Sequence, residues 1–272
     1  MRERLVLARR LAPIALILLL AAALLAGPGI GRWDRDGVDA VPADALLARI
    51  DALPPGALVL VAFDPDLTTY AEIRPAARAV LETLTGAGLR VAIASFSPEG
   101  RALGAAELAR LDVAATPLDL GFIPGGEAGL VSAVRGIVGV AAAGPVADAI
   151  RAGGGGLAAF DLAIVIGGGD IGPRSWVEQV RPRAPELPIA GIVPAVQRPQ
   201  LDPYLASGQL AELVAGPDAV AAMVGPDDAL DRRADAVVLG SLATILVLLL
   251  SGLWPHLARR RPASADADEA AA

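Results

Sequence analysis

Carboxylates and glycines follow short apolar segments in this sequence, which is where α/β proteins commonly carry chemistry. The stretch 57–70 reads ALVLVAFDPDLTTY, so an apolar run ends at Asp64-Pro65-Asp66. Parallel sheets bind ligands at the carboxyl ends of their strands. Other apolar runs lead into serine or glycine in the same way. The candidate site residues at this edge are Asp64, Asp66, Ser95, Gly121, Gly125, Gly126, Gly168, Gly169 and Asp170.

The elements that must position these residues alternate between apolar runs and amphipathic stretches. Most of the apolar runs lack a period of two, which is typical of strands buried on both faces. Strand–helix alternation predicts an α/β fold, a Rossmann-like parallel sheet of about five or six strands with helices on both faces. The expected strands are 58–63, 89–95, 117–122, 162–167, 189–193 and 210–215. The expected helices are 43–53, 70–85, 98–111, 126–138, 143–151, 173–180 and 197–205.

Two long blocks without Asp, Glu, Lys or Arg, 11–30 and 236–257, flank this region, and each is close to the length of about 20 residues that spans a bilayer. We therefore expect transmembrane helices at 11–30 and 234–257, although a cleaved signal peptide is an alternative for the first. The remaining parts are a cytoplasmic N-terminus (1–10), a tether with a short helix (31–55), an α/β domain (56–233) and a disordered cytoplasmic tail (258–272).

Arginine placement predicts how the chain is oriented. Four Arg precede the first block, and Arg259, Arg260 and Arg261 follow the second. Positive charge next to a membrane span stays in the cytoplasm. We therefore expect a bacterial inner-membrane protein with both termini cytoplasmic and the central domain outside, in contact with the lipid bilayer.

Composition excludes several function classes. Residues 31–233 hold 16 Arg against 25 Asp and Glu, a net charge of −9, so we expect no nucleic-acid partner. Cysteine is absent, and the one histidine, His256, lies outside the central domain. A disulfide framework, a thiol nucleophile, a Ser–His–Asp triad and a histidine-ligated zinc site are therefore all excluded there.

The segment at Asp64 resembles the nucleophile motif D-x-D-x-T of haloacid dehalogenase-like phosphatases. The resemblance implies that Asp64 attacks phosphorus, that Asp66 is the general acid and that both help to hold Mg²⁺. Ser95 would bind phosphate, and Gly169-Asp170 would replace the second acidic motif. The chain departs from the family because it has no lysine, because the next carboxylate after Asp170 is Glu178, and because the turn glycine is missing. The alternative is that Asp64 and Asp66 both cap the following helix.

The glycine loops have alternatives of their own. Gly167-Gly168-Gly169 lies between an expected strand and an expected helix, so its N–H groups could hold an anion. It matches neither G-x-G-x-x-G nor a P-loop, and a tight turn explains it equally well. The same two interpretations apply to the loop at Gly125 and Gly126.

Four segments resemble a group of bacterial membrane-anchored proteins without an assigned function: LVLVAFDPD, LGFIPGGEAGL, FDLAIVIGGGD and LDPYLASGQLAELVAG. The resemblance implies an N-terminal anchor, an outer Rossmann-like domain and a C-terminal helix. The layout is also similar to auxiliary subunits of ABC-type exporters, which is a likeness of architecture alone.

These observations favour a non-enzymatic binding or assembly module, accessory to a transporter or a cell-envelope complex. We expect a membrane-protein partner or a homo-oligomer, no cofactor and no metal. Two alternatives remain: an Mg²⁺-dependent phosphohydrolase that uses Asp64, and a small-ligand receptor at the glycine-rich loops.

Overall fold

The computed structural model describes residues 40–111, 117–137, 139, 142–224, 240–241 and 244–245. Residues 37–226 form one compact unit, which is described here by itself. The expected membrane helix at 11–30 lies outside the described residues, as does all but four residues of the one at 234–257. Within the described ranges, no helix combines the length and the apolar character needed to span a bilayer.

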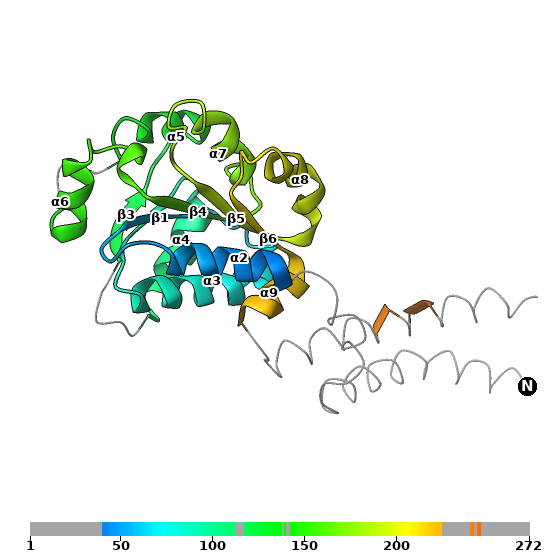
Figure 1. Ribbon diagram of the computed structural model, residues 1–272. Coiled ribbons are helices and arrows are strands. Elements are labelled where there is room, and N and C mark those ends of the chain that lie inside the picture. The colour runs from blue at the N-terminus through cyan, green and yellow to red at the C-terminus, as the bar shows by residue number, and fades with distance from the viewer. Residues whose placement is uncertain are drawn as a thin grey trace, which may run out of the picture. The chain divides into compact units, whose positions relative to one another are not determined.

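A six-stranded, all-parallel sheet forms the centre of this unit (Figure 1). The strand order is β3-β2-β1-β4-β5-β6. The prediction of an α/β fold with a parallel sheet is confirmed. This is the strand order of doubly wound nucleotide-binding folds, but strand order indicates the fold and not the function. The strands are β1 (Leu58–Phe63), β2 (Arg90–Ser95), β3 (Leu118–Phe122), β4 (Leu162–Ile166), β5 (Ile189–Val193) and β6 (Glu212–Ala215).

Burial explains why the central strands consist of unbroken apolar runs. Every residue of β1, β4 and β5 is buried, because helices cover both faces of the sheet. The edge strand β3 differs, since none of its residues is fully buried. It holds Asp119 in the middle and ends at the exposed Phe122.

The helices lie in two layers, one on each face of the sheet (Figure 1). One layer holds α2 (Ala40–Asp51), α3 (Tyr70–Gly86), α4 (Pro98–Leu108) and α9 (Gly216–Val224). The other holds α5 (Glu127–Ala133), α6 (Pro145–Ala152), α7 (Pro173–Gln179) and α8 (Arg198–Ala206). Two short 3-10 helices, η2 (Leu157–Ala159) and η3 (Ala195–Gln197), precede β4 and α8.

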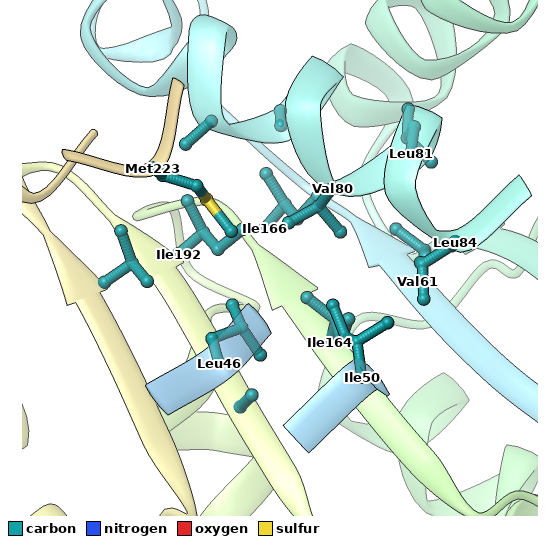
Figure 2. Close-up of a cluster of buried hydrophobic side chains, with 14 of the residues drawn as sticks. Leu46, Ile50, Val61, Val80, Leu81, Leu84, Ile164, Ile166, Ile192 and Met223 are labelled. Atoms are coloured by element: carbon teal, nitrogen blue, oxygen red, sulfur yellow. The ribbon is translucent and has the colours of Figure 1, made fainter. Parts of the chain in front are cut away.

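Each face has its own hydrophobic core. Figure 2 shows the core between the sheet and the helices α2, α3 and α9, where Leu46, Val80 and Met223 meet the strand residues Ile164 and Ile192. The opposite core is built around Trp176 of α7, whose ring packs edge-on against Phe96 at 5.8 Å between ring centroids. Two cores on one sheet hold the strand ends in fixed positions.

The first and last helices of the unit, α2 and α9, pack against each other and against β6. Ala43 and Leu46 of α2 and Ala219, Val220 and Met223 of α9 belong to the same core. Arg49 of α2 donates two hydrogen bonds to Glu212 of β6, at 3.1 and 2.8 Å. Helix α2 is thus part of the folded unit, and α9 is a helix that the sequence patterns did not indicate.

Candidate functional site

The site lies where the strand order reverses, between β1 and β4. In sheets of this kind the crevice at such a switch point is where ligands bind. The ends of the two strands are very close there: the Asp64 amide donates to the Ile166 carbonyl at 2.8 Å. Gly167 has a φ of +140°, and a Cβ on it would lie 2.6 Å from the Pro65 nitrogen and against the Asp64 carbonyl. Glycine is therefore required at 167 by both conformation and space.

Asp64 is the central polar residue of this region and is only 2% exposed. Its Oδ1 accepts three hydrogen bonds, from the amides of Phe96 (2.7 Å) and Ser97 (2.8 Å) and from the Ser97 hydroxyl (2.9 Å). Within the part of the chain that the structure describes, its buried Oδ2 has no hydrogen-bond partner. Burial raises the pKa of Asp64 from 3.8 to about 6, although the three hydrogen bonds oppose that rise.

Helix α4 fits closely over the end of β1. Ser97 caps this helix, because its side chain accepts a hydrogen bond from the Gly100 amide at 3.1 Å while its hydroxyl donates to Asp64. A Cβ at Gly100 would lie 2.7 Å from the Asp64 Cα and would also meet the Phe63 carbonyl. The carboxylate of Asp64 thus lies at the positive end of α4.

Asp66 makes different hydrogen bonds from Asp64, although it is only two residues away. Its Oδ1 accepts the amides of Thr68 (3.0 Å) and Thr69 (2.9 Å), and both threonine hydroxyls also donate to its carboxylate. Desolvation raises the pKa of Asp66, but these hydrogen bonds outweigh it and lower the pKa to about 2. The expectation that both aspartates cap the following helix is therefore half wrong. Asp66 closes the turn into α3, whereas Asp64 binds the loop before α4, because the carboxyl end of β2 lies beside that of β1.

Carboxylates occupy backbone donors at three further places on this edge. Glu99 of α4 accepts the Leu67 amide at 3.3 Å, and Glu72 of α3 accepts the Ala195 amide at 2.8 Å. Asp119 of β3 accepts the Gly121 amide at 2.9 Å. Such amides are the donors that would bind a phosphate. At these positions the chain's own acidic side chains already use them.

The loop between β4 and α7 is an exception. In the described ranges, no backbone carbonyl accepts a hydrogen bond from the amides of Gly168, Gly169 or Asp170. The Gly168 carbonyl does accept from the Gln197 side chain, and the Asp170 carbonyl accepts from the Ser175 hydroxyl at 2.9 Å. The Asp170 side chain is exposed. This loop is where donors remain for an anionic or carbonyl ligand.

The remaining predicted residues are spread along the edge. Ser95 is buried at the end of β2, where its carbonyl accepts the Ile123 amide at 2.8 Å, so Ser97 and not Ser95 contacts Asp64. Gly121 lies within β3 and not in the loop that follows. Gly125 and Gly126 lie in that loop, with φ values of 104° and 57° that L side chains rarely adopt. A Cβ on Gly126 would reach Ile171 of the β4–α7 loop at 3.7 Å, so these two loops are neighbours.

The geometry does not assemble the phosphatase site that the motif implies. In the residues that the structure describes, no group of three His, Asp or Glu side chains lies close enough to hold a metal ion. Asp66, with a pKa of about 2, has no proton to donate at neutral pH, whereas a general acid must hold one. Asp64 has almost no accessible surface from which to attack a substrate.

A second polar cluster was missed by the sequence reasoning. Glu107 of α4 is buried and accepts two hydrogen bonds from Arg78 of α3, at 2.7 and 3.1 Å, and one from Arg110 at 3.3 Å. Burial, together with the neighbouring Glu107, raises the pKa of Tyr70. The Tyr70 hydroxyl nevertheless makes no well-formed hydrogen bond with any described residue. These hydrogen bonds link α3 to α4, the two helices that directly follow the loops around Asp64.

A cavity lies at the opposite, amino edge of the sheet, away from the switch point. It has a volume of about 480 Å³ and is bounded by α2 and by the starts of β4, β5 and β6. Its residues are Ala45, Ala48, Arg49, Ala52, Leu53, Asp161, Leu162, Pro188 and Glu212. Arg49 and Glu212 pair with each other there, and the third charged residue of the lining, Asp161, accepts the Leu58 amide at 2.8 Å.

No family model, no curated protein and no solved structure matches this chain.

Proposed function

We propose that this chain is a membrane-anchored extracytoplasmic binding or assembly module, accessory to a transporter or a cell-envelope complex. One observation carries the proposal: the first and last helices of the folded unit, α2 and α9, pack side by side (Figure 1). The chain thus enters and leaves the domain on one face of the sheet, and an uncharged apolar block precedes the one helix and follows the other in sequence. This arrangement suits a domain that is held from both ends at one surface.

The hydrogen bonding along the carboxyl edge of the sheet supports binding over catalysis. Asp66 accepts the amides before α3, and Asp64 accepts the amides before α4, although both sets of amides could hold a phosphate. In the same way, Glu99 accepts the Leu67 amide and Glu72 accepts the Ala195 amide. A preformed, hydrogen-bonded edge of this kind is suited to contact another molecule without rearranging, because little conformational entropy is lost on binding.

Crosslinking of the full chain in intact cells tests the proposal. We expect the chain in the membrane fraction, and we expect a crosslinked complex of fixed stoichiometry that survives mild detergent. Recovery of the chain as an unpartnered monomer from membranes, with no complex before or after crosslinking, would contradict the assembly role. Recovery in the soluble fraction would contradict the anchor.

A small-ligand receptor is the second candidate, and the β4–α7 loop favours it. The amides of Gly168, Gly169 and Asp170 have no backbone acceptor among the described residues, and they lie at the switch point. A ligand that binds only the folded state raises stability by RT ln(1+[L]/Kd). Thermal-shift screening of the full chain in detergent with phosphates, carboxylates and nucleotides should therefore reveal such a ligand. A Gly169→Pro variant, which removes one donor, should lose the shift.

The phosphohydrolase alternative retains one supporting observation, which is that Asp64 directly follows the central strand β1 at the switch point. A direct assay decides it. The full chain would have to hydrolyse a generic phosphate ester with Mg²⁺, and Asp64→Asn would have to abolish the activity. Turnover that survives in Asp64→Asn would come from a contaminant.

A further inference from the structure

Three large apolar side chains are exposed at the carboxyl edge of the sheet, on three different strand ends. Leu67 follows β1 and is 66% exposed, Val196 follows β5 and is 76% exposed, and Phe122 ends β3 and is 42% exposed. Single exposed apolar residues are common on protein surfaces. Leu67 and Val196 follow β1 and β5, the two strands on either side of β4, and we call the surface that they form the apolar edge (Leu67 and Val196).

Leu67 is held outward by a rigid turn. The residue before it, Asp66, binds the amides of the two residues after it, at 3.0 and 2.9 Å. The Leu67 amide itself donates to Glu99 of α4 at 3.3 Å. These hydrogen bonds restrain the backbone on both sides of Leu67, whose side chain is exposed.

Hydrogen bonds of the two neighbouring residues hold the backbone at Val196 in the same manner. The preceding Ala195 amide donates to Glu72 of α3 at 2.8 Å, and the following Gln197 side chain donates to the Gly168 carbonyl. These two bonds tie η3 to the start of α3 and to the β4–α7 loop, so Val196 and Leu67 belong to one connected set of loops. Rigid presentation of apolar side chains lowers the entropy cost of docking, which is a property of protein-binding surfaces.

The charge around the apolar edge is negative. The loops that follow β1 and β4 present the partly exposed Asp66 and the exposed Asp170 and contain no arginine, and Glu99 accepts the Leu67 amide. Three arginines of the helices at this edge lie close to acidic side chains: Arg101 pairs with Asp119 at 2.8 Å, Arg174 pairs with Glu178 at 2.9 Å, and Arg198 lies 3.7 Å from Asp202. An occupant of this surface must therefore bring apolar and positive groups together.

We propose that the apolar edge docks a segment of another protein that combines apolar side chains with Lys or Arg. This rests on the proposed binding or assembly role and specifies the partner's chemistry. Leu67 and Val196 are the apolar contacts, and Asp66, Glu99 and Asp170 attract the basic groups. An anionic lipid surface does not fit, because the same carboxylates repel it. A second copy of this acidic domain carries the wrong charge in the same way.

The test compares three labelled 15-residue peptides for binding to the detergent-solubilised full chain by fluorescence anisotropy. One peptide alternates Leu and Arg, the second replaces Arg by Glu, and the third replaces Leu by Ser. We expect the Leu/Arg peptide to bind at least about tenfold more tightly than either of the others. Binding by all three alike, or by the Leu/Glu peptide best, would overturn the proposal.

Variants locate the binding on the molecule. Leu67→Ser with Val196→Ser should weaken the Leu/Arg peptide about tenfold, and Glu99→Gln with Asp170→Asn should weaken it several-fold and flatten its salt dependence. The matched controls are Val224→Ser, an exposed apolar residue of α9, and Glu186→Gln at the amino edge, which should change nothing. An equal loss in the controls would show non-specific attraction and would contradict the proposal.

The same variants, crosslinked in cells, separate this inference from the proposed function. If the wild-type chain forms no complex, the assembly role itself fails. If the complex forms equally well with Leu67→Ser and Val196→Ser, the assembly role stands and the apolar edge is not its docking surface. Self-association of the wild-type chain that the double variant abolishes, or binding to phosphatidylglycerol vesicles that it abolishes, would replace the protein segment by another occupant.

Discussion

At the scale of single residues, Asp64 and Asp66 show how burial and hydrogen bonding separate two identical side chains. Both accept backbone amides, yet the pKa of Asp64 rises to about 6 and the pKa of Asp66 falls to about 2. The difference arises because Asp64 is buried with one oxygen unpartnered among the described residues, whereas Asp66 is partly exposed and bound by two threonines. Neither arrangement suits a nucleophile with its general acid.

The raised pKa of Asp64 makes a signed prediction for stability against pH. Between 3.8 and about 6 the folded chain holds a proton that the unfolded chain has lost. The stabilisation from this group is therefore complete below pH 3.8 and is lost as the pH rises through 6. The shift of about two units corresponds to roughly 3 kcal/mol.

Asp64→Asn removes this titration. The unfolding free energy of the variant minus that of the wild type should therefore be larger at pH 7.5 than at pH 4, by up to roughly 3 kcal/mol. Urea unfolding in detergent, followed by the fluorescence of the buried Trp176, measures it. Asp148→Asn, which removes an exposed carboxylate of α6, is the control, and a difference no larger than this control's would contradict the assignment.

The lowered pKa of Asp66 leads to the opposite prediction for the dependence of stability on pH. The contribution of Asp66 to the free energy of unfolding is present above pH 3.8 and is lost as the pH falls toward 2. Asp66→Ala should cost about 1 kcal/mol at pH 7 through loss of the turn that starts α3. Glu82→Ala, at an exposed position of the same helix, should cost much less. Equal losses in the same urea experiment would mean that the Asp66 hydrogen bonds add nothing.

At the scale of elements, the site depends on how closely α4 approaches the end of β1. Gly100 and Gly104 permit this contact: a Cβ on Gly104 would lie 3.3 Å from the Phe63 ring, and one on Gly100 would meet backbone. The buried Glu107, bound by Arg78, fixes the other end of α4 to α3. The two helices therefore position the loops of Asp64 and Asp66 as one unit.

Replacement of Gly100 by alanine tests this packing. Because the new methyl group would overlap the backbone of Phe63 and Asp64, Gly100→Ala should destabilise the fold by about 3 kcal/mol or more. Gly86→Ala is the matched control, since no atom lies within 4 Å of the added Cβ and alanine favours a helix. Thermal unfolding of both variants should differ clearly, and similar midpoints would show that α4 can shift outward at little cost.

Elements were also the level at which sequence reasoning worked best. The buried strands could be predicted because helices on both faces make them unbroken apolar runs, as in LVLVAF and LAIVI. Helix α9 could not be found from periodicity, because its sequence GPDAVAAMV is apolar on most sides. Ser95 was expected to be a ligand-binding residue, and the contact that Ser97 makes with Asp64 was not predicted. The capping sequence Ser-Pro-Glu was the available signal, but only the pairing of β1 with β2 shows which carboxylate it meets.

At the scale of the whole molecule, the absence of cysteine allows the proposed orientation to be tested. Ser264→Cys lies in the C-terminal tail and Gln209→Cys lies in the central domain, where Gln209 is exposed. With a membrane-impermeant maleimide on spheroplasts, Gln209→Cys should be labelled at once and Ser264→Cys only after permeabilisation. The unaltered chain is the control. The reverse pattern would place the domain in the cytoplasm and would remove the basis for an envelope role.

The pairing of α2 with α9 has a mechanical consequence. Tension between the two flanks of the domain would act first on this helix pair and on their shared contact with β6. The central strands β1 and β4 would bear load only after the α2–α9 pair had separated, because β1 follows α2 in the chain and β4 lies beside β1 in the middle of the sheet. Stretching would therefore peel the outer helices away before it disturbed the switch point, and the carboxyl edge would keep its shape while the domain was pulled.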